Sequence, residues 1–397
     1  DTIPAYIGKP FTVIALVGVI NALNHSDGLD GLAGGESLLS FGAVAYLAYL
    51  YDGFSVLVIS AATMGGIFGF LRFNSHPARV FMGDGGSQVI GYALGVVVVL
   101  LTQDVNPVFS PAIALLLIGL PVVDILAVFF LRAKGGMNLF RATKNHIHHR
   151  LLALGFYHYE SVMLIYSVQA LLVICAILFP YENDFLLTGI YLMITTLVFS
   201  VLTIAEHRNY HVHQSVPGSG VSKILPEYLQ NKHVLALPGQ VLESGVMIFL
   251  IGAALMSVTI PADIAVSALA LLLMFLLLVL VPKFANLFLL RLIVFISIGF
   301  AVYLSTSYPP AWLIEQHYLV LLFFALLTVA GFMSFRLSVE ANFQITPLDY
   351  LVIIIALIIA VIPENDATGR NLTWMALQMV VLFYASELVL QRMNTVR

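Results

Sequence analysis

Charged residues and cysteine are scarce in this sequence. Only 10% of the 397 residues are Asp, Glu, Lys or Arg, whereas a soluble globular domain contains about a quarter. With 60% of the residues hydrophobic, a water-soluble core could not hold the apolar chain, so lipid is the expected solvent. The net charge of -4 argues against electrostatic affinity for nucleic acid, and the single cysteine, Cys175, excludes an internal disulfide.

The apolar residues form long continuous runs, which are typical of membrane-spanning helices. Backbone polar groups inside a bilayer must be paired internally, and runs without alternation favour helices over a barrel. We therefore expect an all-α fold, a polytopic transmembrane helical bundle of about 13 spans. The expected spans are residues 9–24, 37–50, 54–72, 87–103, 110–131, 160–179, 185–205, 241–259, 262–281, 284–304, 316–334, 348–362 and 371–390.

Lys and Arg indicate the orientation of these spans. If the first span ends in the cytoplasm, most of the 17 Lys and Arg residues fall on the cytoplasmic side, as the positive-inside rule requires. Nearly all the histidines then share that side. The sequence therefore predicts that polar chemistry is gathered on the cytoplasmic face.

The chain changes character along its length. Residues 1–209 have long inner loops rich in motifs, and residues 210–240 form a polar connector with a Pro-Gly-Ser-Gly turn. Residues 241–397 contain six apolar spans with sparse loops. We predict a membrane domain, a connector and a membrane extension whose role the sequence does not reveal.

The first inner segment places amides and carboxylates at helical spacing. Asn21, Asn24, Asp27 and Asp30 follow one another every three residues, so the first pair shares a helix face. Glycines around the aspartates allow close approach of the backbone to a ligand. Such a group suits a hard cation, or a ribose and base. The alternative is a helix stop with Asx turns.

The second inner loop ends in Gly83-Asp84-Gly85-Gly86-Ser87, which opens a helix. Free backbone N–H groups at a helix N-terminus bind anions, and Ser87 can cap that helix. Asp84 would repel a phosphate directly, so we interpret it as a ligand of Mg²⁺ that bridges to a diphosphate. The alternative is a capped turn in which Asp84 serves only the backbone.

The third inner loop, residues 132–158, is the most basic part of the chain. It contains His146, His148, His149 and Arg150 in one run beside apolar residues. We expect a cationic surface patch that holds phosphate oxygens, with forked contacts from Arg150. A zinc site is an alternative, but the run offers neither a thiolate nor a carboxylate. A plain positive-inside loop against anionic lipid is another.

Together these stretches resemble the polyprenyl-phosphate N-acetylhexosamine-1-phosphate transferases of bacterial cell-envelope synthesis, of the glycosyltransferase family 4 type. The shared segments are NALNHSDGLDGLAGG at 21–35, FNSHPARVFMGDGGS at 73–87, PVVD at 121–124 and HIHHRLLALGF at 146–156. They occur in the family's order, and the resemblance covers about residues 1–209. The HIHH form is similar to the branch that uses UDP-N-acetylglucosamine.

The resemblance implies a multi-pass enzyme of the bacterial inner membrane with a cytoplasmic active site. It would transfer N-acetylhexosamine-1-phosphate from a UDP-sugar to undecaprenyl phosphate and release UMP, with Mg²⁺ or Mn²⁺, for lipopolysaccharide, O-antigen or cell-wall synthesis. It also allows a homodimer. The implied roles are metal binding for Asn21 and Asp84, catalysis for Asp27, Asp30 and Asp84, and substrate binding for Asn24, Gly85, Gly86, Ser87, His146, His148, His149 and Arg150.

One departure from the family bears on activity. The family carries an Asp-Asp pair on an earlier cytoplasmic loop, and this sequence contains no Asp-Asp pair. We expect that the chain is truncated at its N-terminus and that the fragment alone is inactive. The alternative is a degenerate homologue.

Two other classes of membrane protein compete with this interpretation. A CDP-alcohol phosphotransferase requires DxxDGxxAR followed by further aspartates, and only the start of that pattern occurs, at Asp27 to Gly31. A transporter without transferase activity predicts polar residues near mid-membrane in broken helices. The polar residues here are mainly in inner loops, which favours the transferase.

Overall fold

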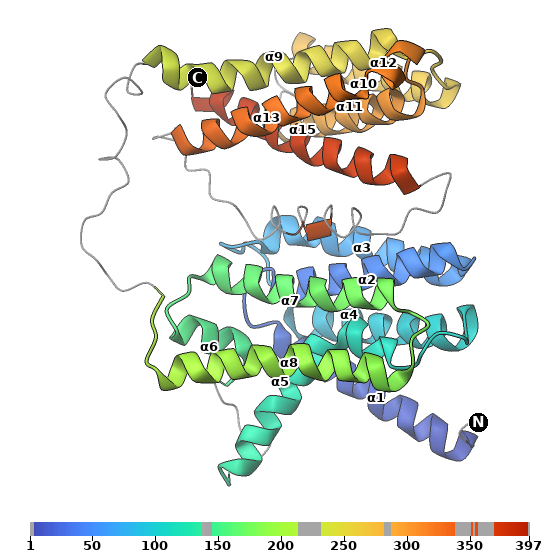
Figure 1. The fold of residues 1–397 in the computed structure, drawn as a ribbon, viewed down its shortest axis with the longest axis vertical. Helices are drawn as coiled ribbons and strands as arrows, with labels where there is room; N and C mark the ends of the chain where they lie inside the picture. The colour runs from blue at the N-terminus through green and yellow to red at the C-terminus, as the bar shows by residue number, and fades with distance from the viewer. Residues whose placement is uncertain are drawn as a thin grey trace. The chain divides into compact units, whose positions relative to one another are not determined.

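The computed structural model describes residues 4–136, 138, 145–212, 232–281, 287–337, 351, 354–355 and 369–395. These residues form helices and their connections, and no strand occurs among them. The chain divides into two compact units (Figure 1). Unit 1 comprises Asp1–Pro217 and Ile345–Val361, and unit 2 comprises Gly218–Gln344 and Ile362–Arg397.

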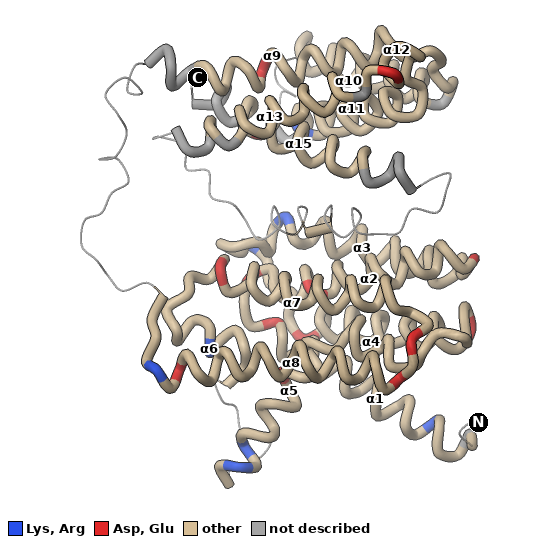
Figure 2. The backbone as a smooth tube through the Cα atoms, viewed as in Figure 1, with Lys and Arg blue, Asp and Glu red and all other residues tan. Residues whose placement is uncertain are grey.

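Unit 1 is built of long helices joined by short connections. The helices are α1 (Ala5–Ser26), α2 (Leu32–Leu50), α3 (Phe54–Asn74), α4 (Gly83–Leu100), α5 (Ile113–Lys134), α6 (Ile147–Ala153), α7 (His158–Leu178) and α8 (Asp184–His207). A π-helical turn, η1 (Leu101–Val105), extends α4. The basic residues Arg72, Arg132, Lys134 and Arg208 lie where α3, α5 and α8 end. In Figure 2 blue segments mark Lys and Arg on α3 and near the ends of α5 and α8, and another lies near the N-terminus.

Helix α2 is the buried centre of unit 1. It packs against α3 and α7, and Phe41 and Val44 are fully buried. One glycine allows the packing against α7. A Cβ on Gly35 would lie 2.0 Å from the hydroxyl of Tyr166, which donates a hydrogen bond to the Gly31 carbonyl at 2.6 Å. A larger side chain at position 35 would therefore force α2 and α7 apart.

A proline in α5 explains the buried Gln169. Pro121 has no N–H, so the carbonyl of Leu117 one turn earlier loses its helical donor. Gln169 of α7 replaces that donor, because its Nε2 lies 2.9 Å from the Leu117 oxygen and 3.0 Å from Ser40 Oγ. This side chain is completely buried. One amide therefore links three helices in a region where water cannot pair the freed carbonyl.

Unit 2 is a smaller set of apolar helices. They are α9 (Lys232–Met256), α10 (Ala262–Leu280), α11 (Leu287–Ser307), α12 (Ala311–Glu315), α13 (His317–Leu337) and α15 (Gly369–Thr395). Buried residues of α9, α11, α13 and α15 form a common hydrophobic core that includes Leu242, Ile298 and Leu382. Arg291 and Glu387 form an ion pair at 2.5 Å beside it.

The predicted fold class is confirmed, and the number of spans is not. Eight described helices are long and apolar enough to cross a membrane, and α10, α13 and α15 contain shorter apolar segments. The chain is therefore a multi-pass membrane protein. Helix α2, predicted as the span 37–50, is not among the eight, because Glu36, serines and glycines lower its hydropathy. Most of the predicted span 348–362 and of the predicted connector lies outside the described residues.

Candidate functional site

The end of α1 meets the start of α4 through polar side chains. Asn24 Nδ2 lies 3.1 Å from Asp84 Oδ1 and 2.9 Å from Ser87 Oγ. Ser87 is buried, whereas Asp84 and Gly85 are exposed at the first turn of α4. The close approach depends on Gly91, where a Cβ would lie 2.8 Å from the Ile20 Cα. The backbone packing of α1 on α4 thus brings Asn24 to Asp84.

Asp27 completes this group from the turn after α1. Gly83, in the left-handed conformation with φ 65°, donates its N–H to the Asp27 carboxylate. Burial raises the pKa of Asp27, and the nearby negative charge of Asp84 raises it further, while the Gly83 hydrogen bond opposes both. Two carboxylates that repel each other offer oxygen ligands, which Mg²⁺ prefers.

Asn21 lies one turn before Asn24 and is exposed. Its Nδ2 donates to the Val17 carbonyl at 2.8 Å, which fixes the amide on the surface of α1. The structure thus brings Asn24, Asp27, Asp84 and Ser87 together, and it places Asn21 on the preceding turn. The metal role predicted for Asn21 and Asp84 stays a prediction.

Asp30 belongs to a second group formed by two histidines. Its Oδ2 accepts hydrogen bonds from His76 Nδ1 at 2.8 Å and from the Ala78 N–H at 3.0 Å. Burial tends to raise the pKa of Asp30, but these two hydrogen bonds outweigh burial and lower it. His158 stacks on His76 with ring centroids 4.1 Å apart. Sequence reasoning quoted His76 only as part of a motif and assigned no role to it or to His158.

Two histidines of the predicted run are buried rather than on the surface. His146 and His148 are only 6% and 3% exposed, so the expectation of an exposed cationic patch is wrong for both. His146 Nδ1 lies 2.8 Å from Asp124 Oδ2, and Asp124 Oδ1 accepts the Ile147 N–H at 2.8 Å. Asp124 is the carboxylate that the run itself lacks, and it comes from α5.

The His148 side chain lies against the first inner segment and so joins the histidine run to it. A Cβ on Gly28 would lie 2.3 Å from His148 Nε2, so only glycine fits beside that ring. Burial lowers the pKa of His148 to about 4, and the neighbouring His149, at 4.2 Å between ring centroids, adds to this shift. His148 is therefore a neutral imidazole that faces the Asp27–Asp30 turn.

Arg150 points to a different partner. Its Nε and terminal nitrogen bind the two oxygens of Glu206 on α8 at 2.7 and 2.8 Å, and Thr203 Oγ1 lies 3.0 Å away. This forked ion pair joins α6 to α8. The prediction that Arg150 binds a substrate phosphate is untested, and the substrate-binding roles of Gly85, Gly86, His146, His148 and His149 also stay predictions.

Sequence reasoning missed one buried acid near the site. Glu36 is 2% exposed in α2 and accepts a hydrogen bond from Ser26 Oγ, next to Asp27. A glutamate inside an otherwise apolar helix was the available signal, because a buried carboxyl requires a partner. Asn74 also supports the site, since it accepts the Gly31 N–H and donates to the Val80 carbonyl, both at 2.9 Å.

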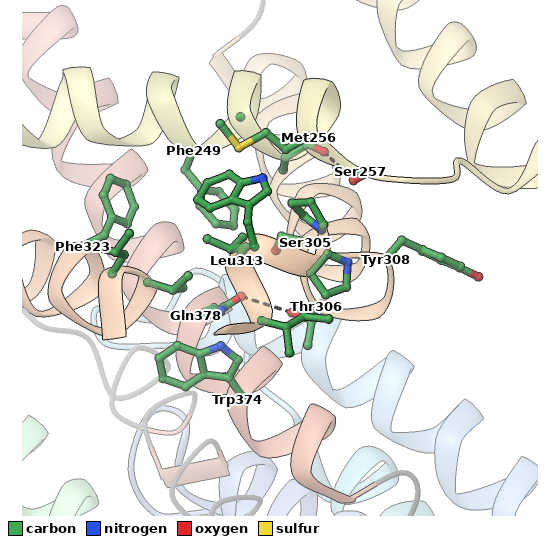
Figure 3. A pocket seen from close by; sticks show the side chains of 18 of the residues that line it. Phe249, Met256, Ser257, Ser305, Thr306, Tyr308, Leu313, Phe323, Trp374 and Gln378 are labelled. Carbon is green, nitrogen blue, oxygen red and sulfur yellow. Dashed lines mark hydrogen bonds between the residues drawn. The ribbon is translucent and has the colours of Figure 1, made fainter. Parts of the chain in front are cut away.

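Unit 2 contains a cavity of about 530 Å³ that holds none of the predicted site residues. Its lining is mainly apolar and includes Phe249, Phe323 and Trp374 (Figure 3). The buried Gln378 also lines it, and its Oε1 accepts a hydrogen bond from Thr306 Oγ1 at 3.4 Å. The motifs of the sequence are therefore concentrated in unit 1.

Comparisons with known proteins support the resemblance. Residues 2–102 match the family model of glycosyl transferase family 4. A probable undecaprenyl-phosphate N-acetylglucosaminyl 1-phosphate transferase of Bacillus subtilis is 36% identical over 172 residues, 43% of this chain and 48% of that protein. The undecaprenyl-phosphate alpha-N-acetylglucosaminyl 1-phosphate transferase of Escherichia coli is 32% identical over 180 residues, 44% of this chain and 49% of that protein.

A related enzyme class also matches. The phospho-N-acetylmuramoyl-pentapeptide-transferase of Listeria monocytogenes is 36% identical over 177 residues, 43% of this chain and 52% of that protein. The chain thus spans about half the length of the curated relatives that it matches. Over residues 2–102 the chain matches glycosyl transferase family 4, and the resemblance drawn from its motifs is confirmed.

Proposed function

We propose that this chain supplies most of the active site of a transferase that moves N-acetylhexosamine-1-phosphate from a UDP-sugar to undecaprenyl phosphate. The sugar is N-acetylglucosamine, and the product serves cell-envelope polysaccharide synthesis, such as that of lipopolysaccharide or O-antigen. The site faces the cytoplasm at the bacterial inner membrane. Relatives named for this reaction in two bacteria support the proposal.

The observation that carries the proposal is the meeting of three separate connections. The turn after α1 provides Asp27, the start of α4 provides Asp84, and α6 provides His148. Two kinds of side chain, carboxylates and an imidazole, thus lie around one small region. Transfer of a phosphoryl group needs positioning and charge neutralisation more than covalent chemistry.

The reaction balances without an oxidant or a further substrate. A phosphate oxygen of the lipid attacks the β-phosphorus of the UDP-sugar, and the bond from that phosphorus to the bridging oxygen breaks. UMP leaves with the electron pair of that bond, and the sugar phosphate stays on the lipid as a diphosphate.

The residues of this chain would divide the work. Asp84, with Asn21 and Asp27, would hold Mg²⁺ or Mn²⁺, which when bound would neutralise charge on the diphosphate. Gly85, Gly86 and Ser87 would offer backbone and hydroxyl groups to phosphate oxygens at the start of α4. His148, neutral at pH 7, would donate a hydrogen bond to the sugar phosphate, and Asp30 would act at the nucleotide.

The test measures UMP release by the full-length protein, supplied with UDP-N-acetylglucosamine, undecaprenyl phosphate and Mg²⁺. Asp84→Asn should lower turnover at least ~100-fold, on the scale of removing one group that stabilises transition-state charge. Asp104→Asn makes the same chemical change at an exposed position on η1 and should leave turnover unchanged. Wild-type turnover in Asp84→Asn would refute the metal assignment.

A second outcome separates the proposal from a degenerate homologue or a transporter. Either of those would fail to release UMP in the same assay. Retained binding of UDP-N-acetylglucosamine without turnover would favour the degenerate homologue, and the transferase proposal would then fall.

A further inference from the structure

Asp30, His76 and His158 come from three different segments and meet at one point. Asp30 lies in the turn between α1 and α2, His76 in the loop after α3, and His158 at the first residue of α7. One carboxylate oxygen and one ring nitrogen from each histidine all lie within 4.8 Å of one another. Among the described residues, no other cluster of His, Cys, Asp and Glu has this spacing.

We propose that these three residues bind Zn²⁺, or a similar first-row transition metal, at a site separate from the Asp27–Asp84 group. Two imidazoles and one carboxylate are a common ligand set for Zn²⁺. Mg²⁺ prefers oxygen ligands alone, so it should select the carboxylates of Asp27 and Asp84. The two sites would thus take different metals because of their donor atoms.

The existing contacts are compatible with metal exchange. His76 Nδ1 and Asp30 Oδ2 now share a hydrogen bond at 2.8 Å, and a divalent ion could replace that proton between the same two atoms. His158 Nε2 lies 3.3 Å from the Asp30 carbonyl oxygen, so its ring already faces Asp30. The His76 side chain is 43% exposed, which leaves a path for the ion.

Three protein ligands would leave one position of a tetrahedral ion open to water or a ligand. Binding would also tie together the α1–α2 turn, the loop after α3 and the start of α7. A further consequence rests on the proposed function. Because Asp30 is also expected to act on the nucleotide, bound Zn²⁺ would lower transferase turnover, whereas metal binding itself does not depend on that function.

The experiment uses the full chain in nanodiscs and titrates Zn²⁺ alone, with metal content and the thermal unfolding midpoint as readouts. We expect one ion per chain and a rise in the midpoint, because a ligand of the native state stabilises it. His76→Asn and His158→Gln should each weaken binding at least ~10-fold. His211→Gln, an exposed histidine whose Nδ1 contacts only the nearby Asn209 carbonyl, is the matched control and should bind normally.

Co²⁺ adds a readout that a structural hydrogen bond cannot produce. A tetrahedral Co²⁺ site gives ligand-field absorption in the visible range, which should be present in the wild type and lost in both histidine variants. The thermal midpoints of the metal-free variants show whether each still folds. If His76→Asn does not fold, His158→Gln carries the test.

Four results would overturn the proposal. The first is that Zn²⁺ fails to bind the wild type at micromolar concentration, and the second is that it binds both histidine variants as it binds the wild type. Loss of Zn²⁺ in Asp84→Asn would place the ion with the carboxylates of Asp27 and Asp84. Loss in His148→Gln, with binding retained in His158→Gln, would place it in the buried histidine run instead.

Discussion

The two units bury polar side chains in different ways. In unit 1, buried polar residues form connected sets, such as Asp124 with His146 and the Ile147 N–H, and Gln169 with Ser40 and Leu117. In the described part of unit 2 the hydrophobic core is apolar, and polar pairs such as Arg291–Glu387 and the buried Gln378 with Thr306 are separate from one another. Both units have helices apolar enough to cross a membrane.

This difference indicates where function lies. A polar group in an apolar interior costs free energy unless it is fully paired, so a membrane protein gains nothing by burying one without a use. Unit 1 retains many of them next to its motif-bearing turns. Unit 2 instead packs hydrophobic side chains around a cavity. If buried polar contacts matter more in unit 1, substitutions there should lower the free energy of unfolding more than substitutions in unit 2.

The largest loss of stability is expected from Asp124→Ala in unit 1. It would leave the His146 ring nitrogen and the Ile147 N–H, in residues 6% and 5% exposed, without their acceptor. Two buried donors left unpaired should cost about 4 kcal/mol in the free energy of unfolding, measured by equilibrium unfolding in detergent. Asp104→Ala, at an exposed position, should cost little. A similar small loss for Asp124→Ala would show that these contacts are weak.

Acid should destabilise unit 1 through His148. Its folded-state pKa is about 4, below the usual 6.5, because burial disfavours the charged ring. Between these values the unfolded chain binds more protons than the folded chain. The contribution of His148 to the free energy of unfolding is therefore fully present above about pH 6.5 and is lost as pH falls through about 4. The loss should approach about 3 kcal/mol. His148→Gln should flatten the pH profile of the unfolding free energy, whereas His211→Gln should not.

Arg291 and Glu387 of unit 2 should contribute to the free energy of unfolding only as a pair. Glu387→Leu leaves the Arg291 guanidinium partly buried without its carboxylate, which should cost about 2 to 3 kcal/mol of unfolding free energy. The double variant Arg291→Leu with Glu387→Leu should recover most of this loss, because an apolar pair fits the apolar core. Glu243→Leu, on an exposed position of α9, is the control. Additive losses in the double variant would contradict the pairing.

The smallest expected effect concerns Gln169. Gln169→Leu removes the donor to the carbonyl that Pro121 leaves unpaired and should cost about 1 to 2 kcal/mol. In a Pro121→Ala background the backbone N–H returns to that carbonyl, so the same substitution should cost less. A double-mutant cycle measures this coupling. Equal losses of unfolding free energy in both backgrounds would mean that Gln169 does not compensate for the N–H that Pro121 lacks.

Part of the site was accessible from spacing alone. Residues three apart at a helix end share a face, and a glycine-rich turn before a helix binds anions, so Asn24, Asp84 and Ser87 could be selected from the sequence, and the structure joins them by hydrogen bonds. The partners of the histidines could not be predicted from the sequence. Asp124 lies 22 residues before His146 on another helix, and no local pattern indicates which distant carboxylate meets which ring.

The sequence by itself indicated a lipid environment, the all-α fold class and the resemblance to glycosyl transferase family 4, because apolar runs and short motifs are local properties of the chain. Tertiary structure alone decided that His148 is buried against Gly28, that Arg150 pairs with Glu206, and that His76 and His158 reach Asp30. Each of these depends on how helices far apart in the sequence pack. Packing sets the burial of a ring and the identity of its neighbours, and these in turn set its charge.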